Sequence, residues 1–244
     1  MIRLLLIVIF LVLFLLLSIP LMLIEWIIGK FNMDIKDKSS LAIVKFGFHG
    51  ITWLAGTKVT VIGEENIPHD TAVLYIGNHR SYFDIVLTYL RVPRPTGYIA
   101  KGEMTHIPLL NIWMKYLHCL FLDRKDIKKG LKTILTAVEY VKSGISMCIF
   151  PEGTRNKVND TFLPFHEGSF KIASKSGCPI IPMTINNSAA IFEDHIPFIK
   201  KTHVIIEYGK PIQLSELSPE EKKHPGAYVQ SIIEKTYFKN KALL

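Results

Sequence analysis

Cysteines are few in this sequence, and they lack the spacing that disulfide frameworks and zinc sites require. The 244 residues include three of them, Cys119, Cys148 and Cys178, each in or beside an apolar segment. An odd number of isolated cysteines argues against a disulfide scaffold, and no zinc-finger spacing is present. We expect three reduced thiols packed in the core of a cytosolic domain.

Dense clusters of basic and aromatic residues are also missing, as are internal repeats, low-complexity tracts and an interdomain linker. Lys and Arg outnumber Asp and Glu by 29 to 21, which gives a net charge of +8, and the basic residues are spread over most of the chain beyond residue 29. This distribution suits an anionic membrane surface or an acidic substrate better than a nucleic acid. We therefore expect one α/β domain with a membrane segment, and no nucleic-acid partner.

Charged residues are nearly missing from the N-terminal region. From Leu4 to Ile24 the chain is almost uninterrupted Leu, Ile, Val and Phe, broken only by Ser18 and Pro20. About twenty such residues match the hydrocarbon thickness of a bilayer. No small-residue cleavage site follows, which argues against a signal peptide. Basic residues are more numerous after this stretch than before it, which favours a protein in the cell membrane with its bulk on the cytoplasmic side.

A second, weaker apolar segment runs over residues 39–57. On a helix, Leu41, Val44, Phe48 and Ile51 would share one face, with polar residues on another. The segment either lies in the membrane interface or packs on the domain core. Both interpretations make residues 1–57 a membrane-anchoring region of two helices, followed by a folded domain at residues 58–244.

Beyond residue 57, β-rich apolar segments alternate with helical patterns. The clearest helical pattern is Ile127 to Lys142, and Pro219 to Phe238 is typical of a closing helix whose start Pro225 can delay. The alternation predicts an α/β fold with a mixed, largely parallel sheet flanked by helices. The expected strands are Val59–Ile62, Ala72–Ile76, Gly97–Ala100, Cys119–Leu122, Ser146–Phe150, Pro179–Ile185 and His203–Tyr208.

A histidine and an aspartate follow the second of these strands, in the run Asn78-His79-Arg80-Ser81-Tyr82-Phe83-Asp84. Activating an alcohol at neutral pH requires a base, and an imidazole oriented by a carboxylate meets that need. Across a strand-to-helix turn, Asp84 can return beneath the His79 ring. The alternative is that Ser81 and Asp84 merely cap the following helix, and the two interpretations are compatible.

A serine-nucleophile mechanism is the other possibility for this run. Ser81 lies two residues from His79, but the sequence has no G-x-S-x-G elbow. Adjacent residues in a tight turn seldom present a hydroxyl to the neighbouring imidazole. Direct attack by a substrate hydroxyl is the simpler hypothesis.

A candidate phosphate loop follows the strand that ends at Phe150. Gly153 permits close backbone approach, Thr154 supplies a hydroxyl and Arg155 supplies a planar cation, a combination that suits a phosphate monoester. Glu152 would repel a dianion, so we expect it to organise the loop by bonding loop amides or Arg155. An ordinary polar turn with a surface arginine is the alternative.

Two further cations, Lys101 and Arg124, stand beside predicted strand ends and are candidate phosphate partners. Each has an ordinary alternative, because most lysines are simply solvated and Arg124 could pair with Asp123 or Asp126. The segment Pro179 to Met183 is typical of a buried strand with a packing role.

Together these motifs resemble the 1-acylglycerol-3-phosphate acyltransferases, the family of bacterial PlsC within the wider glycerolipid acyltransferases. Four blocks match in order over about a hundred residues, which is far more specific than a single H-x-x-x-x-D. They are Asn78 to Asp84 for the family's N-H-x-x-x-x-D, Lys101-Gly102-Glu103 through Phe121-Leu122-Asp123-Arg124 for its second block, Phe150-Pro151-Glu152-Gly153-Thr154-Arg155 for F-P-E-G-T-R, and Ile181-Pro182-Met183 for its proline block.

The resemblance implies an α/β acyltransferase fold behind membrane-embedded helices. It implies that His79 is the general base and Asp84 its orienting partner, in direct acyl transfer to the sn-2 hydroxyl of lysophosphatidate. It further implies an acceptor site made of Glu152, Gly153, Thr154 and Arg155, helped by Lys101 and Arg124. It also implies an acyl-CoA or an acyl carrier protein thioester as the donor, and a reaction that requires no cofactor or metal.

One block departs from the family pattern. Many relatives show F-K-K-G-A-F after the phosphate loop, whereas this chain reads Phe165-His166-Glu167-Gly168-Ser169-Phe170. The departure bears on acceptor and donor preference. Glycerol 3-phosphate or another lysolipid is an alternative acceptor, and a non-catalytic membrane lipid-binding protein is the alternative from a different class.

Overall fold

The core of the protein is one seven-stranded sheet, seen in a computed structural model that describes residues 1–123 and 126–244. The strand order is β1-β7-β6-β2-β5-β3-β4. The strands are β1 (Lys58–Ile62), β2 (Leu74–Gly77), β3 (Thr96–Lys101), β4 (Leu120–Leu122), β5 (Ser146–Ile149), β6 (Ile180–Asn186) and β7 (His203–Tyr208). All seven predicted strands are present, each within two residues of its expected ends. Neighbouring strands are parallel except β6 and β7, which confirms the mixed, largely parallel sheet.

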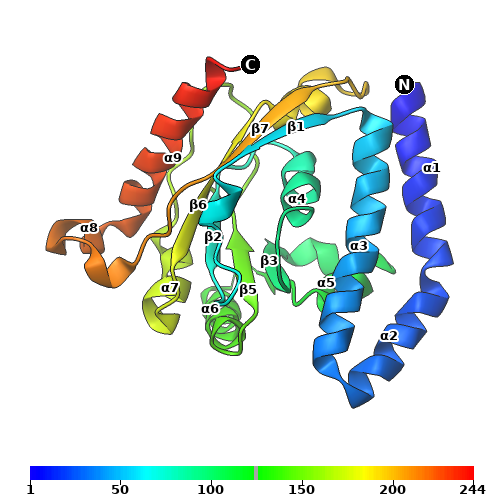
Figure 1. Cartoon of the computed structure of the whole chain (residues 1–244), viewed down its shortest axis with the longest axis horizontal. Helices are drawn as coiled ribbons and strands as arrows, with labels where there is room; N and C mark the ends of the chain where they lie inside the picture. Colours follow the sequence, from blue (N-terminus) through cyan, green and yellow to red (C-terminus); the bar gives the residue numbers. More distant parts are fainter. Residues whose placement is uncertain (124–125) are drawn as a thin grey trace.

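Helices cover both faces of this sheet. Figure 1 shows α3, α4 and α5 on one side and α6, α7 and α9 on the other. The helices are α1 (Ile2–Leu17), α2 (Ile19–Phe31), α3 (Met33–Ala55), α4 (Tyr82–Tyr89), α5 (Leu110–Tyr116), α6 (Ile127–Lys142), α7 (Lys171–Ser176), α8 (Pro219–Lys223) and α9 (Pro225–Lys241). The period-two alternation of a strand divides the core in two: Tyr75 of β2 joins the cluster beneath α3 and α4, while Leu74 and Ile76 join the cluster beneath α6 and α9.

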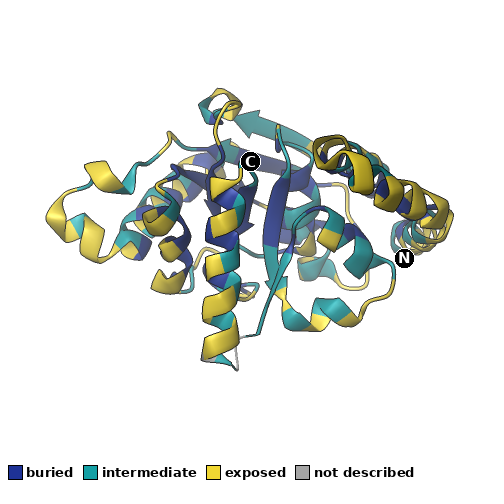
Figure 2. Cartoon of the chain, turned by 90° about the horizontal axis from the view of Figure 1, so that it is seen from below, coloured by how far each residue is buried: buried dark blue, intermediate teal, exposed yellow. Residues whose placement is uncertain are grey.

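The predicted N-terminal anchor is not one continuous helix. It breaks at Ser18 into α1 and α2, because Pro20 has no N–H to continue the helical ladder. In the part of the chain that the structure describes, no single helix has the length and apolarity to cross a bilayer, although α1 and α2 together do, as a pair bent by 46°. The Trp113 indole N–H donates to the Ser18 hydroxyl at 2.9 Å, which ties the bend to α5. Figure 2 shows many exposed residues on the helices nearest the N-terminus.

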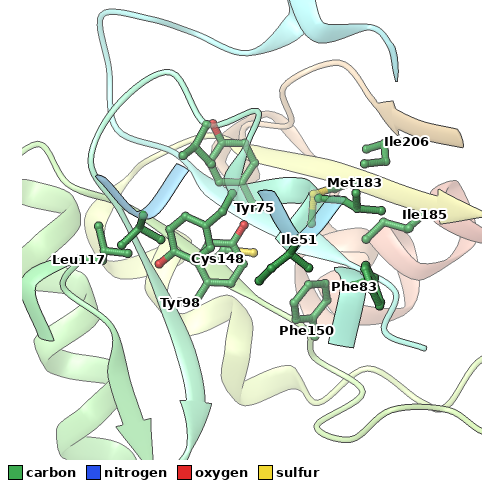
Figure 3. Close-up of a cluster of buried hydrophobic side chains, with 14 of the residues drawn as sticks. Ile51, Tyr75, Phe83, Tyr98, Leu117, Cys148, Phe150, Met183, Ile185 and Ile206 are labelled. Carbon is green, nitrogen blue, oxygen red and sulfur yellow. The ribbon is translucent and has the colours of Figure 1, made fainter. Parts of the chain in front are cut away.

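The expectation of two helices in residues 1–57 was therefore wrong, since this region forms α1, α2 and α3. Helix α3 does not lie only in a membrane interface, which was one of its two predicted positions, but packs on the domain core. Its apolar face, with Leu41, Val44 and Ile51, is buried in the domain core, and Figure 3 shows Ile51 among the core side chains. Phe46 and Trp53 on other faces of α3 remain exposed.

The remaining predicted elements fall close to their expected places. Helix α6 spans the predicted residues 127–142. The closing helix begins at Pro219 but is split at His224 into α8 and α9, whereas the sequence indicated one helix whose start Pro225 can delay. All three cysteines are free and buried, and burial raises the pKa of each thiol.

Candidate active site

Parallel pairing brings two of the sequence blocks to the same edge of the sheet. Strands β2 and β5 are neighbours in parallel register, so Asn78 and Phe150 follow them at the carboxyl edge. Ligand sites of open α/β sheets lie at this edge. Asn78 fixes its own position because its side-chain amide accepts from the N–H of Ile185 at 2.8 Å and donates to the Ile185 carbonyl at 2.9 Å.

His79 and Asp84 meet across the turn into α4. The Nδ1 of His79 lies 2.8 Å from Oδ2 of Asp84, a carboxylate that is fully buried. The same oxygen accepts from the N–H groups of Arg80 at 2.7 Å and Ser81 at 2.8 Å. Helix capping and imidazole orientation are therefore performed by one carboxylate, which joins the two interpretations left open by the sequence.

The His79 imidazole is held by a contact on its ring face as well as by the hydrogen bond at Nδ1. Its ring stacks on Phe150 with centroids 4.3 Å apart and planes 16° from parallel, and Figure 3 shows Phe150 at the border of the core. The His79 side chain keeps 15% of its surface exposed. With Nδ1 donating to Asp84, the Nε2 atom carries the lone pair, and no described residue bonds to it. This arrangement leaves one ring nitrogen able to accept a proton.

The Ser81 hydroxyl is occupied by two other groups. It accepts from the N–H of Phe83 at 3.0 Å and donates to the Glu193 carboxylate at 2.6 Å. The hydroxyl proton therefore points to Glu193, and a lone pair of the hydroxyl oxygen accepts from the backbone of the helix. Ser81 is thus a capping residue in this geometry, in line with direct attack by a substrate hydroxyl.

The loop after β5 holds the backbone of His79 from both sides. Glu152 accepts from the His79 N–H at 2.8 Å, and the Asn156 N–H donates to the His79 carbonyl at 2.8 Å. The other oxygen of Glu152 accepts from the N–H of Leu163 at 3.1 Å. Burial raises the pKa of the Glu152 carboxyl, and these amide hydrogen bonds oppose that rise. Glu152 bonds backbone amides, one of the two arrangements expected for it, and among the described residues it has no bond to Arg155.

The loop residues that follow are less buried than Glu152. Gly153 has a positive φ of 74°, a backbone conformation that favours glycine, and Thr154 is exposed. The Arg155 guanidinium lies 3.6 Å from the centroid of the Tyr82 ring and 3.1 Å from the Glu193 carboxylate. The structure therefore brings Arg155 against the first turn of the helix that carries Asp84.

The remaining predicted residues lie at the ends of β3 and β4. Lys101 is exposed, with its ammonium 3.9 Å from the Glu103 carboxylate, and no contact joins it to His79 within the described residues. Arg124 lies outside the described residues. An open pocket of about 570 Å³ lies between this edge and α6, and its lining includes Ala100, Phe150 and Gly153 from the edge and Ile134 from α6. His166 and Glu167, where the sequence departs from its family pattern, also line this pocket.

Two contributors were missed from the sequence, Glu193 and Arg80. Glu193 stands in an irregular segment, the short 3-10 helix η5 (Glu193–His195), with no motif around it that would have indicated a role. Arg80 is inside the first block and largely buried, where its Nε donates to the Asn156 carbonyl at 3.4 Å. Its place in the block was the available signal.

Comparison with known proteins points in one direction. A family model described as Acyltransferase matches residues 58–186. The chain is 34% identical to the 1-acyl-sn-glycerol-3-phosphate acyltransferase of Borreliella burgdorferi over 75% of this chain and 73% of that one. It is 30% identical to the enzyme of that name from Haemophilus influenzae over 82% of each.

A solved structure agrees with the fold. The crystal structure of the 1-acyl-sn-glycerophosphate (LPA) acyltransferase PlsC from Thermotoga maritima superposes with a TM-score of 0.80 over 99% of this chain and 98% of that one, at 24% identity. At that identity the likeness establishes the fold alone.

Proposed function

Because the chain belongs to the acyltransferase family that includes the 1-acyl-sn-glycerol-3-phosphate acyltransferases, we propose that it acylates the sn-2 hydroxyl of lysophosphatidate. The acyl group comes from a thioester, and the product is phosphatidate. The observation that carries this proposal is the His79–Asp84 pair, whose free Nε2 lies at the same sheet edge as the loop that holds Arg155.

In the proposed mechanism His79 is the general base. Its Nε2 removes the proton from the sn-2 hydroxyl as the oxygen attacks the thioester carbonyl, while Asp84 holds Nδ1–H and stabilises the imidazolium. The C–O bond forms, the C–S bond breaks, and the imidazolium returns its proton to the departing thiolate. General-base assistance of this kind typically contributes about 10²–10⁴-fold to a rate.

The acceptor's phosphate is assigned to the loop after β5. Gly153 lets the backbone approach closely, the Thr154 side chain is exposed, and the Arg155 side chain keeps 31% of its surface exposed. Glu152 organises the loop behind them. Lys101 and Arg124 belong to the proposal as further cations. Contacts to the phosphate, which is remote from the reaction, position the reacting hydroxyl beside the base. These contacts therefore contribute to turnover as well as to binding.

The N-terminal region is assigned to the membrane. Residues 1–57 are the anchor and residues 58–244 the acyltransferase domain, on the cytoplasmic side of the cell membrane. The support is the run of exposed apolar side chains on α1 and α2, which soluble surfaces rarely carry as one patch. An anchored enzyme meets its lysophosphatidate in the bilayer. Its donor is an acyl-CoA or an acyl carrier protein, and the reaction as proposed uses no cofactor.

The decisive experiment is formation of phosphatidate from lysophosphatidate by detergent-purified protein. Acyl-CoA and acyl carrier protein are offered in parallel as donors, and His79→Ala is assayed beside the wild type. We expect product from the wild type with at least one donor and a loss of about 10²-fold or more in the variant. A folded wild type that makes no product with either donor would contradict the proposal, and glycerol 3-phosphate would be the next acceptor to assay.

A further inference from the structure

One carboxylate outside the four sequence blocks contacts two of them at once. Glu193 Oε1 accepts from the N–H of Tyr82 at 2.8 Å and from Nη1 of Arg155 at 3.1 Å. Its Oε2 accepts from the Ser81 hydroxyl at 2.6 Å. Glu193 thus joins the first turn of α4, which carries Asp84, to the cation of the phosphate loop.

The contacts on α4 hold Glu193 independently of the arginine. A backbone N–H at a helix N-terminus favours a negative charge, and the Ser81 hydroxyl supplies a second bond. Only 15% of the Glu193 side chain is exposed, so these bonds form in a partly desolvated place where they are stronger than in water. The carboxylate is consequently a fixed point against which a mobile side chain can be ordered.

Arg155 is the side chain that is ordered. Glu193 engages its Nη1, and the Tyr82 ring covers one face of the guanidinium at 3.6 Å. An arginine has five N–H donors, and the Arg155 side chain keeps 31% of its surface exposed. One donor is therefore used for positioning, while exposed surface remains for an incoming anion.

A competing role gives the opposite prediction. Glu193 could instead occupy the place of the substrate's phosphate and have to be displaced from Arg155. The geometry favours positioning, because Glu193 keeps two bonds to α4 whether or not Arg155 is engaged, and a single N–H joins it to the guanidinium.

We propose that Glu193 is a positioning residue for the acceptor: it fixes Arg155 against the first turn of α4, so that the phosphate site and the His79 base keep a constant separation. This inference rests on the proposed function, since it assumes that Arg155 receives the acceptor's phosphate. Ordering the guanidinium before the substrate arrives reduces the entropy that binding would otherwise lose.

Steady-state kinetics of the full chain test this inference. Glu193→Ala should raise the KM for lysophosphatidate by about tenfold, while the KM for the donor stays within about twofold. Glu193→Gln should stay near wild type, because its amide oxygen can still accept from Tyr82 and Arg155. Glu216→Ala is the matched control, since Glu216 is an exposed glutamate in another 3-10 helix, η6 (Leu214–Glu216).

The double variant separates positioning from a purely structural effect. In an Arg155→Ala background, Glu193→Ala should add less than about twofold, because the residue it positions is gone. An undiminished effect in that background would overturn the inference, and so would a lowered KM in the single variant, which would show competition with phosphate.

A second readout does not depend on turnover. Phenylglyoxal modifies accessible arginines. The folded protein is treated with it and then digested, and the rate of modification at Arg155 is followed by mass spectrometry of the peptides. We expect faster modification in Glu193→Ala than in the wild type or Glu216→Ala, and equal rates would overturn the inference. If the wild type fails to acylate lysophosphatidate, the proposed function fails, and this readout still decides whether Glu193 orders Arg155.

Discussion

At the scale of single residues, Asp84 carries two tasks on one carboxylate oxygen. Oδ2 accepts from the His79 ring and from two backbone N–H groups, whereas Oδ1 is buried without a hydrogen bond to any described residue. Any substitution there therefore affects both the cap of α4 and the imidazole. The two effects differ in size and can be measured separately.

We predict that Asp84→Asn lowers kcat by about 10²-fold or more, since the base loses its charged partner. The free energy of unfolding should fall by about 0.5–2 kcal/mol, the range for a weakened helix cap. Urea denaturation and steady-state kinetics measure the two effects, with exposed Asp70→Asn as the control. If Asp84→Asn retains the wild-type kcat and only loses stability, Asp84 acts as a helix-capping residue alone.

Arg155 is expected to contribute more to substrate binding than to the stability of the fold. Its partners are a partly exposed carboxylate and an aromatic ring, and exposed ion pairs contribute about 0–1 kcal/mol to stability. A charged hydrogen bond to a substrate is worth about 1.5–3 kcal/mol. The residue is therefore expected to matter for substrate use more than for folding.

We predict that Arg155→Ala lowers kcat/KM for lysophosphatidate by about 10–100-fold and the free energy of unfolding by about 1 kcal/mol or less. The nearby exposed Lys157→Ala serves as the control in the same loop. Proportionate losses of stability and activity would argue that Arg155 is a structural residue.

At the scale of elements, the site depends on close approach between strands and turns. An added Cβ at Gly97, in β3, would overlap the carbonyl oxygen of His118 in the turn that precedes β4. Backbone atoms cannot move aside as a flexible side chain can. Gly97 is thus required by the packing of β3 against that turn.

We predict that Gly97→Ala lowers the free energy of unfolding by about 1–3 kcal/mol, as overpacking does. Gly168→Ala is the matched control because no atom lies within 4 Å of the position its Cβ would take, and a change within about 0.5 kcal/mol is expected there. Thermal or urea unfolding measures both. Equal effects would show that the His118 turn yields to the new methyl group.

At the scale of the whole molecule, the distribution of exposed apolar residues is uneven. Long runs of α1 and α2 expose Leu, Ile and Val, and Leu17 is 74% exposed. The Trp113–Ser18 bond and the bond from the Tyr116 hydroxyl to the Met22 carbonyl attach these helices to α5. A membrane that receives the helices would therefore also hold the catalytic edge at a defined orientation.

We predict that Leu17→Glu weakens binding to phospholipid vesicles by about tenfold or more, because the leucine's transfer into lipid is lost and a charge must be desolvated. Vesicle co-sedimentation measures the effect. Leu243→Glu is the control, since Leu243 is 60% exposed near the other end of the chain. Equal weakening by both substitutions would place the membrane contact elsewhere.

Local sequence patterns determined the positions of the strands and of the His79–Asp84 pair. β-rich apolar segments located the seven strands, and the spacing of His79 and Asp84 across a strand-to-helix turn located their hydrogen bond, because both depend on neighbours in sequence. The break of the N-terminal anchor at Ser18 was not predicted, although Pro20 lies beside it, and Trp113 of α5, which bonds to Ser18, is far away in sequence.

Contacts between distant segments were decided only by the tertiary structure. Phe150 under the His79 ring, Glu152 on the His79 amide and the burial of α3 each depend on which strands become neighbours. Glu193 is the clearest case, because 38 residues separate it from Arg155 and no local pattern indicates the pair. Sequence periodicity reports which face of an element is buried, whereas the partner across a fold is chosen by packing of the whole chain.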